Sequence, residues 1–384
     1  MGGSEYFQFS KHLNVLIKPS DGCNLRCVYC FHQDYGYAPN SMKEDVLDRF
    51  CVITFPHYNC ISVVWHGGEP TFVGLDQFKR YEEIIKYYSK KYSVNLKQSI
   101  QTNGVLLTEE FVTFLSHNDI SIGISYDGPT NSISRGSTDA FFRTKKLLEK
   151  NKVHFGVISV ISKLNVNHLI ELYTHMNEQS IPFQMNHYIS VPGADENRLG
   201  LSVDDISENY SLLFDYWYND ELCHISVEPF MRIIKDIKTN QISVCSRASC
   251  LYNWCCLDVD GKILPCDRDF PDEYLYGSVC AMNDFREIYS SKGFHSLVEK
   301  AVIRRRACKA DCDIFKFCNG GCNNNALLET GIENNNGVSC KINKWMIHFI
   351  MEKIETLELF NQNKTHPNPV LNSYLHFLLK ENSK

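Results

Sequence analysis

Apolar and polar positions follow two alternating patterns over roughly the first 230 residues. Short runs rich in Val, Ile and aromatic residues have the length of buried strands, and the segments between them repeat apolar residues with the period of a helix. The predicted strands are 13–18, 61–68, 96–104, 120–128, 153–162 and 181–189, and the clearest helices are 41–55, 75–91 and 203–219. This alternation predicts six βα units, a parallel sheet and right-handed crossovers.

The first predicted helix carries a start signal. Ser41 is followed three residues later by Glu44, which is the spacing of a capping box. We therefore predict that this helix begins with Ser41 as its N-cap.

Several predicted strands end in glycine and polar residues. The endings read HGGEP (66–70), QTNG (101–104) and SYDGP (125–129), and the loop GCNLRCVYCFH (22–32) follows the first strand. Ligands of parallel α/β sheets and barrels bind at the carboxyl ends of the strands. We therefore expect these segments to meet at one mouth.

The pattern changes from about residue 240, where long periodic segments fade and Cys, Gly and Asn become frequent. We predict an α/β domain over 1–235, a cysteine-rich domain over 236–345, and a C-terminal helix and tail over 346–384. The last helical pattern covers about 341–360.

Composition narrows the class of protein. Hydrophobic residues make up 43% of the 384 residues, and the net charge is −6. No apolar run reaches the roughly 20 residues of a membrane span, and the first residues lack a signal-peptide pattern. We expect a cytoplasmic protein with no membrane or nucleic-acid partner, in which the basic run 304–306 is a solvated surface.

The chain has 17 cysteines, and their distribution is uneven. Three lie within 23–30, two more precede Cys223, and twelve lie between 223 and 340. Disulfides are disfavoured in a reducing compartment, so clustering of this kind indicates metal ligation.

The first group, Cys23, Cys27 and Cys30, has the spacing C-x3-C-x2-C. A structural zinc site needs four ligands, and His32 could supply the fourth. The alternative is a 4Fe–4S cluster with three thiolates and one open iron, which can chelate a small molecule and deliver an electron to it.

This motif, with Tyr29 before the third cysteine, resembles the radical S-adenosylmethionine (SAM) superfamily. HGGEP resembles the segment of that family that binds the methionyl amino group of SAM. Glycines allow close backbone approach, and Glu69 is an acceptor for an ammonium. The residues that the resemblance assigns to SAM are Gly67, Gly68, Glu69, Gln101, Asn103, Ser125 and Asp127.

The resemblance implies a partial (β/α)6 barrel of the TIM type. It also implies that a cluster at the mouth reduces SAM, and that the resulting 5′-deoxyadenosyl radical takes a hydrogen atom from the substrate. SAM itself would then be the missing ligand of the open iron. His32 and His66 are assigned to the substrate.

The later cysteines resemble the SPASM extension of radical SAM enzymes, which carries two auxiliary 4Fe–4S clusters. The usual pattern places two residues in the first gap after Cys308, and this chain has three. Over nearly the whole chain the resemblance is to anaerobic sulfatase-maturating enzymes. It assigns Cys245, Cys250, Cys266 and Cys322 to the nearer cluster, and Cys308, Cys312, Cys318 and Cys340 to the farther one.

Two alternatives stay open for this region. A zinc ribbon is one of them. The other concerns the ligand set, because Cys255 and Cys256 lie between assigned ligands and make the second position uncertain. The remaining cysteines, Cys51, Cys60, Cys223 and Cys280, are interpreted as small buried hydrophobic residues.

Asp267 follows Cys266 directly. In the sulfatase-maturase pattern an Asp at this place is the base that deprotonates the side chain being oxidised. The structural alternative is an Asp that caps a helix or a turn.

The first hypothesis is an enzyme that modifies a peptide or protein residue, by oxidation to formylglycine or by crosslinking a ribosomal peptide. A flavodoxin- or ferredoxin-type protein would supply electrons. A radical dehydrogenase of a small molecule and a non-catalytic metal-binding scaffold are the alternatives. Of the segment that usually follows DGP in sulfatase maturases, only Arg135-Gly136 has a counterpart in this chain. About a dozen residues precede the first strand, so we expect the barrel mouth and the second domain to recognise the substrate.

Overall fold

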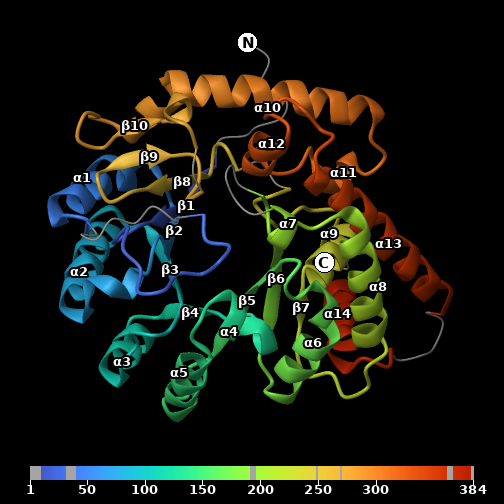
Figure 1. The fold of residues 1–384 in the computed structure, drawn as a ribbon. Coiled ribbons are helices and arrows are strands. Elements are labelled where there is room, and N and C mark those ends of the chain that lie inside the picture. The colour runs from blue at the N-terminus through green and yellow to red at the C-terminus, as the bar shows by residue number, and fades with distance from the viewer. Residues whose placement is uncertain are drawn as a thin grey trace. The chain divides into compact units, whose positions relative to one another are not determined.

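The computed structural model describes residues 10–31, 40–190, 196–247, 250–268, 270–360 and 366–381 (Figure 1). The chain divides into two compact units. Unit 1 comprises Met1–Ser125, Arg135–Phe155 and Ser249–Val302, and unit 2 comprises Tyr126–Ser134, Gly156–Ala248 and Ile303–Lys384. The predicted domain boundaries at 235 and 345 stay predictions.

Unit 1 is built on a sheet with the strand order β10-β9-β8-β1-β2-β3-β4. The strands are β1 (His12–Ile17), β2 (Cys60–Trp65), β3 (Asn95–Thr102), β4 (Ile120–Ser125), β8 (Trp254–Leu257), β9 (Lys262–Leu264) and β10 (Gly277–Ser278). From β8 to β4 all neighbours are parallel, whereas β9 and β10 are added antiparallel. The predicted parallel α/β fold is confirmed.

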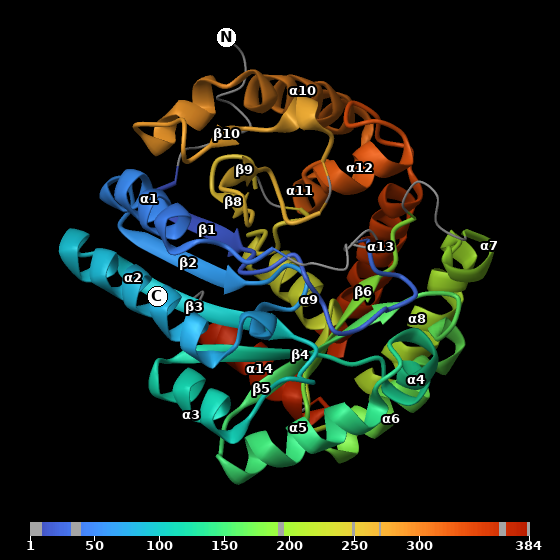
Figure 2. The ribbon, with the colours of Figure 1, turned by 60° about the vertical axis from the view of Figure 1, so that its left-hand side comes forward.

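Helices cover the parallel strands of unit 1, and Figure 2 shows α1 and α2 alongside β1, β2 and β3. The helices are α1 (Glu44–Thr54), α2 (Leu75–Tyr92), α3 (Glu109–His117) and α5 (Thr138–Lys150), with short 3-10 turns at Phe55–His57, Pro70–Val73, Asp272–Tyr274 and Phe285–Ser290. The buried face of α2 packs against β2, where the Trp65 ring lies 5.0 Å from that of Phe78 and 6.2 Å from that of Tyr81. Each such burial contributes roughly 1.5–3 kcal/mol.

The predicted capping box of α1 is wrong. The helix begins at Glu44, and its N-cap is Lys43, which makes no side-chain cap. Ser41 instead forms an antiparallel bridge with Ser20, and the Met42 N–H donates to the Pro19 carbonyl (2.8 Å). The loop after β1 therefore holds this backbone extended up to Met42, and the helix cannot start earlier.

Unit 2 contains the parallel strands β5 (Phe155–Ile161), β6 (Phe183–His187) and β7 (Val227–Glu228). The first residue of β5, Phe155, is counted with unit 1. Its helices are α4 (Asn131–Ser134), α6 (Leu169–Glu178), α7 (Glu196–Leu199), α8 (Val203–Tyr218), α9 (Phe230–Thr239), α11 (Phe315–Cys318), α12 (Asn323–Glu329), α13 (Val338–Phe360) and α14 (Pro369–Glu381), with 3-10 turns at Gly128–Thr130 and Val166–His168. Aromatic rings of α8 and α9 form its core, where Phe214, Trp217 and Phe230 are all fully buried.

The region after residue 240 is more regular than its sequence pattern indicates. Helix α10 (Lys292–Asp311) begins in unit 1 and ends in unit 2. Its apolar and polar residues are mixed around the axis, so no stripe of period 3.6 marks it. Among the helices of the described part of the chain, none is long and apolar enough to cross a membrane.

Candidate active site

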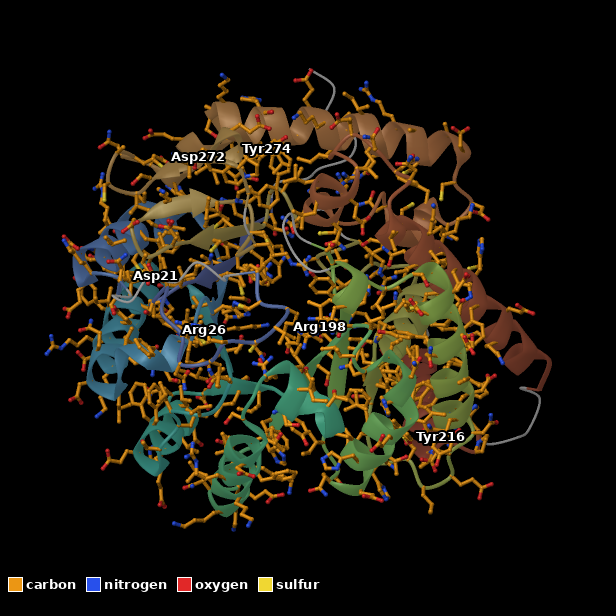
Figure 3. All side chains as sticks on the ribbon, in the orientation of Figure 1. Asp21, Arg26, Arg198, Tyr216, Asp272 and Tyr274 are labelled. Carbon is orange, nitrogen blue, oxygen red and sulfur yellow. The ribbon has the colours of Figure 1, made fainter. Side chains whose placement is uncertain are left out.

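The three-cysteine loop follows β1, and Figure 3 labels Arg26 within it and Asp21 directly before it. Within it the Cys30 N–H donates to the Cys27 carbonyl (3.1 Å), which closes a tight turn. Burial raises the pKa of Cys23, and the neighbouring charges of Glu69 and Cys27 raise it further. Thiols gathered on one turn in this way suit an iron–sulfur cluster, which takes thiolate ligands.

The loop HGGEP packs directly onto the three-cysteine loop. The Glu69 N–H donates to the Gly22 carbonyl (2.7 Å), and the Gly68 N–H donates to the Ser20 carbonyl (3.3 Å). A Cβ on Gly68 would lie 2.2 Å from the Gly22 oxygen, so no larger residue fits there. The second glycine of the motif is therefore required by the contact between the two loops.

Glu69 ties the end of β2 to the end of β3. It is 1% exposed, and its Oε1 accepts hydrogen bonds from the Thr71 N–H (3.0 Å) and from the hydroxyls of Thr71 and Thr102 (2.6 Å each). Its Oε2 accepts the Asn103 N–H (2.8 Å). These donors satisfy the buried carboxylate, and through them Glu69 orders the QTNG segment.

The structure also brings together Gln101 on β3 and Ser125 on β4. The Gln101 side chain donates to the Ser125 hydroxyl (2.9 Å). A Cβ on Gly123 would lie 2.3 Å from the Gln101 carbonyl oxygen, so the glycine makes room for this side chain.

Asp127 belongs to unit 2, and its carboxylate serves the turn in which it lies. It is 1% exposed, and its two oxygens accept the Ser134 hydroxyl (2.6 Å) and the Val160 N–H (2.9 Å). The sequence-based assignment of Asp127 to SAM stays a prediction.

Asp267 lies beside His66 in unit 1. His66 follows β2, and its N–H donates to the Ile17 carbonyl (2.9 Å). Its Nδ1 lies 3.2 Å from the Asp267 Oδ2, at ion-pair distance but without the angle of a hydrogen bond. The Cys266 thiol donates to the Asp267 Oδ1 (3.0 Å). A predicted base, a predicted substrate contact and a predicted cluster ligand thus adjoin one another.

The surroundings of Asp267 favour its charged form. Burial acts to raise the pKa of the carboxyl, but the charge of His66, the Cys266 hydrogen bond and the cations Arg268 and Lys18 outweigh it and lower the pKa to about 2. Opposite charges and donated hydrogen bonds stabilise a carboxylate in this manner.

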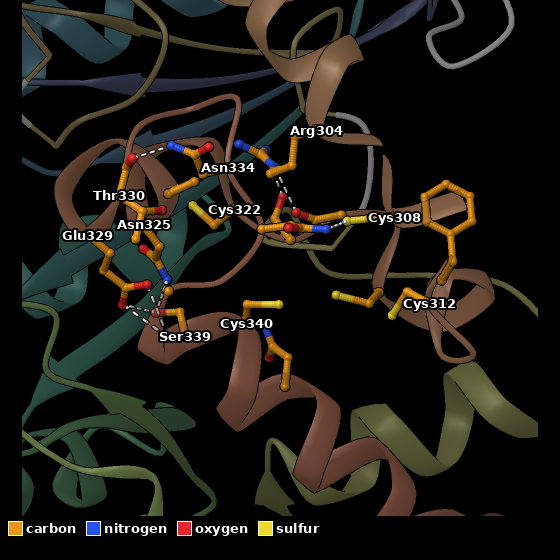
Figure 4. Close-up of a pocket in the computed structure, with 18 of the residues that line it drawn as sticks. Arg304, Cys308, Cys312, Cys322, Asn325, Glu329, Thr330, Asn334, Ser339 and Cys340 are labelled. Carbon is orange, nitrogen blue, oxygen red and sulfur yellow. Dashed lines mark hydrogen bonds between the residues drawn. The ribbon is translucent and has the colours of Figure 1, made fainter. Parts of the chain in front are cut away.

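A second group of cysteines lines a cavity in unit 2 (Figure 4). The cysteines that line it are Cys308, Cys312, Cys318, Cys322 and Cys340. Burial raises the pKa of Cys318 to about 12, and the neighbouring charges of Cys340, Cys308 and Cys312 act in the same direction. Thiolates placed this close together repel one another unless metal cations bind them. The predicted ligands of the farther cluster therefore share one site.

The turn that carries Cys318 and Cys322 is held by a buried arginine. Arg304 on α10 is 1% exposed and donates to the Gly320 carbonyl (2.9 Å), the Ile332 carbonyl and the Asn323 side-chain oxygen. Arg305 is fully buried. The expectation that the run 304–306 is a solvated surface is wrong for Arg304 and Arg305, because the glycine-rich turn presents carbonyl groups that require donors. Arg306 is exposed, as expected.

The predicted ligands of the nearer cluster are divided between the units. Cys250 and Cys266 belong to unit 1, where both adjoin the buried Tyr276 and help burial to raise its pKa. Cys245 and Cys322 belong to unit 2. This ligand set stays a prediction.

The remaining cysteines differ in how deeply they are buried. Cys255 and Cys256 are fully buried in β8 and pair in register with β1, while Cys51 and Cys223 are buried as expected. Cys60 is half-buried and Cys280 is exposed, so their interpretation as buried residues is wrong. His32 lies outside the described residues.

The part of the chain that the structure describes contains no group of side chains arranged to bind a single metal ion. No three His, Cys, Asp or Glu side chains there converge closely enough to hold one metal ion.

The family profile described as "Radical SAM superfamily" matches residues 17–176, a segment that contains the three-cysteine loop and every strand ending discussed above. The chain contains a radical SAM domain. This family implies a 4Fe–4S cluster and SAM, for which Cys23, Cys27 and Cys30 are the candidate ligands.

Anaerobic sulfatase-maturating enzymes resemble the chain over most of its length. The cysteine-type anaerobic sulfatase-maturating enzyme of Clostridium perfringens is 28% identical over 333 residues, which are 81% of this chain and 88% of that enzyme. The serine-type enzyme of Bacteroides thetaiotaomicron is 24% identical over 363 residues, 86% of this chain and 87% of its own.

Solved structures give the same result for the fold. The structure named "Native anSMEcpe with bound AdoMet and Cp18Cys peptide" has a TM-score of 0.77 and 25% identity, and the match covers 90% of this chain and 98% of that one. SuiB of Streptococcus suis bound to S-adenosylmethionine has a TM-score of 0.62 at 18% identity, with 86% and 76% covered. The radical SAM fold therefore extends well beyond the profile match.

Two positively charged side chains near the three-cysteine loop were not assigned a role from the sequence. Arg135 donates to the Tyr29 hydroxyl (2.6 Å), and its charge acts to lower the pKa of Cys23. Lys18, at the end of β1, is 7% exposed and acts to lower the pKa values of Cys256 and Asp267. The Arg-Gly echo after DGP was a weak signal for Arg135, and no pattern marked Lys18.

Proposed function

We propose that this chain is a radical SAM enzyme that modifies a residue of a peptide or protein after removing a hydrogen atom from it. The observation that carries this proposal is the contact between His66 and Asp267. It places a charged carboxylate beside the HGGEP loop, in the same unit as the three-cysteine loop. A base beside the radical site serves an oxidation, in which a proton must leave the substrate.

The protein would hold three 4Fe–4S clusters and SAM. Cys23, Cys27 and Cys30 would hold the first cluster beside SAM, and the eight later cysteines would hold two auxiliary clusters. When bound and reduced, the first cluster supplies a 5′-deoxyadenosyl radical from SAM, which takes one hydrogen atom from the substrate. Described residues give the Glu69 Oε2 one donor, so this oxygen can accept a second from the ammonium of SAM.

Asp267 would take the proton that the oxidised residue loses. Loss of a hydrogen atom, a proton and an electron completes a two-electron oxidation of the substrate. The proton would go to the Asp267 carboxylate. The adjoining Cys266 would hold the nearer auxiliary cluster, which would supply an electron acceptor. His66 holds the carboxylate in place and contacts the substrate.

A peptide or protein is the substrate class that the relatives support. The names of two similar structures state a bound peptide: anSMEcpe with the Cp18Cys peptide and SuiB with the precursor peptide SuiA. Unit 2 of this chain has a cavity of about 510 Å³ at the carboxyl ends of β5 and β6. Among the residues that line it are Lys163, Tyr188, Leu201 and Ile342. A cavity of this size accepts side chains of a peptide.

Formylglycine formation and crosslinking begin with the same hydrogen abstraction, and both need a base and an electron acceptor. A serine that becomes formylglycine loses two hydrogen atoms in total, and so does a pair of residues that becomes crosslinked. A cysteine also exchanges its sulfur for oxygen when water hydrolyses the thioaldehyde. A flavodoxin- or ferredoxin-type protein is the one-electron donor we propose for the first cluster.

The decisive test is turnover with peptides. Anaerobically reconstituted enzyme is incubated with SAM, a reductant and peptides that contain Cys or Ser, and 5′-deoxyadenosine and peptide masses are measured. We expect 5′-deoxyadenosine together with a peptide that has lost two hydrogen atoms and that, where the modified residue is Cys, has also exchanged sulfur for oxygen. Oxidation of a small alcohol or sugar, with peptides left unchanged, would support the small-molecule dehydrogenase instead. Zinc without acid-labile sulfide would sink both enzyme hypotheses and leave the scaffold.

A further inference from the structure

The side chain of Asn103 is fixed against the first cysteine of the radical SAM loop. Its Nδ2 donates to the Cys23 sulfur (3.8 Å) and to the Asn24 side-chain oxygen (2.8 Å). Its Oδ1 accepts the Val105 N–H (2.9 Å). Because the Val105 N–H requires an acceptor, the amide cannot turn around and present its oxygen to the sulfur.

Neighbouring groups hold Asn103 rigidly in this place. The residue is 8% exposed, and its N–H donates to the buried Glu69 (2.8 Å). The adjacent Thr102 hydroxyl also donates to Glu69 (2.6 Å). The glutamate of HGGEP therefore sets the position of the amide that contacts Cys23.

A second donor converges on the same sulfur, since the Leu25 N–H lies 3.4 Å from it. Reduction adds negative charge to a cluster and its thiolates. N–H groups aimed at a ligand sulfur stabilise that charge, and hydrogen bonds to sulfur are among the features that set cluster potentials. Cys23 is therefore a ligand through which the protein can adjust the first cluster.

We propose that Asn103 is a positioning residue whose side-chain N–H···S bond to Cys23 raises the reduction potential of the radical SAM cluster. The inference rests on the part of the proposed function in which the loop binds a cluster, and it does not depend on the substrate. Both N–H groups of the amide and its oxygen are engaged within the protein. Asn103 thus acts on the cluster through its ligand, which differs from the contact with SAM that the motif predicts.

The test is a redox titration of the reconstituted enzyme, followed by electron paramagnetic resonance. The radical SAM cluster is recognised because SAM alters its signal. We expect Asn103→Ala to lower the midpoint potential of this cluster and to leave those of the auxiliary clusters unchanged. Asn103→Asp should lower it at least as far, because an oxygen replaces the donor. The control Asn24→Ala removes the neighbouring bond and keeps the donor to sulfur, so its shift should be smaller.

An unchanged midpoint in Asn103→Ala, with full iron content, would overturn the proposal. A measurement on the wild-type enzyme covers the case in which this variant does not fold. Asparagine labelled with ¹⁵N in its side chain should show a coupling to the reduced cluster by electron–nuclear double resonance, and the absence of that coupling also overturns it. Failure of every peptide assay would refute the proposed substrate and leave these readouts intact.

Discussion

The guanidinium of Arg247 lies 2.8 Å from the carboxylate of Asp236, and the two side chains are 5% and 0% exposed. Arg247 also donates to the Phe317 carbonyl (3.4 Å), next to Cys318. Burial lowers the pKa of Arg247, and the charge of Asp236 opposes that change. An ion pair buried this deeply links α9 to the turn that carries Cys318.

Removal of one member of this pair should destabilise unit 2. Asp236→Asn leaves the buried guanidinium without its counter-charge, and such a change costs roughly 3–5 kcal/mol. We expect a lower denaturant midpoint together with lower iron content. The control is Lys150→Met, which breaks an exposed pair with Glu109 (2.7 Å) and should cost less than about 1 kcal/mol. Equal shifts in the two variants would contradict a special role for the buried pair.

Gly68→Ala should abolish tight SAM binding. Its Cβ would lie 2.2 Å from the Gly22 oxygen, so the HGGEP loop and the three-cysteine loop must separate. Gly156→Ala is the control, because the nearest atom to its Cβ is 3.7 Å away. Equilibrium binding of SAM to the reconstituted proteins is the measurement, and wild-type affinity in Gly68→Ala would show that the loops do not need this contact.

The sequence predicted the elements whose signal is local. Short runs rich in Val, Ile and aromatic residues marked most of the strands from β1 to β6, and cysteine spacing marked the segments that carry Cys23 and Cys308. Contacts between distant segments carried no such signal. The pairing of β8 with β1 was hidden because Cys255 and Cys256 were weighed as ligands and not as strand residues.

The wrong predictions have the same origin. Ser41 and Glu44 have the spacing of a capping box, but the backbone of Ser41 instead forms a β-bridge with Ser20. Arg304 reads as a surface charge, and it is buried because a glycine-rich turn far along the chain offers carbonyl groups. His66 and Asp267 belong to two motifs that lie far apart in the sequence. The sequence suggested a role for each residue, but it did not indicate that they are in contact.

Asp267→Asn should uncouple SAM cleavage from product formation. The amide cannot accept the substrate proton, and loss of a general base typically costs 10²–10⁴ in rate. We expect product formation to fall by about that factor while 5′-deoxyadenosine is still released. His66→Gln keeps the carboxylate and should show a smaller loss. Equal falls of 5′-deoxyadenosine and product in Asp267→Asn would place the residue in cofactor binding instead.

A bulky residue in the cavity of unit 2 should weaken peptide binding. Ile189 lines the cavity and is half-buried, so Ile189→Trp fills part of it. We expect a higher KM for the peptide, with SAM cleavage in the absence of peptide unchanged. Leu212→Trp, at a side chain on α8 that is 55% exposed, is the control of equal bulk. An unchanged KM in Ile189→Trp would place the peptide elsewhere.

Cys340→Ala should remove one cluster and leave the others. Cys340 lies among the thiols of the unit 2 cavity, and the charges of Cys308 and Cys312 help burial to raise its pKa. Three 4Fe–4S clusters correspond to about twelve irons per chain, so we expect about eight in the variant. The exposed Cys280 provides the control, since Cys280→Ala should retain all of them. Iron and acid-labile sulfide are measured together, because their equal loss identifies a cluster, whereas iron loss without sulfide loss would contradict the assignment of Cys340.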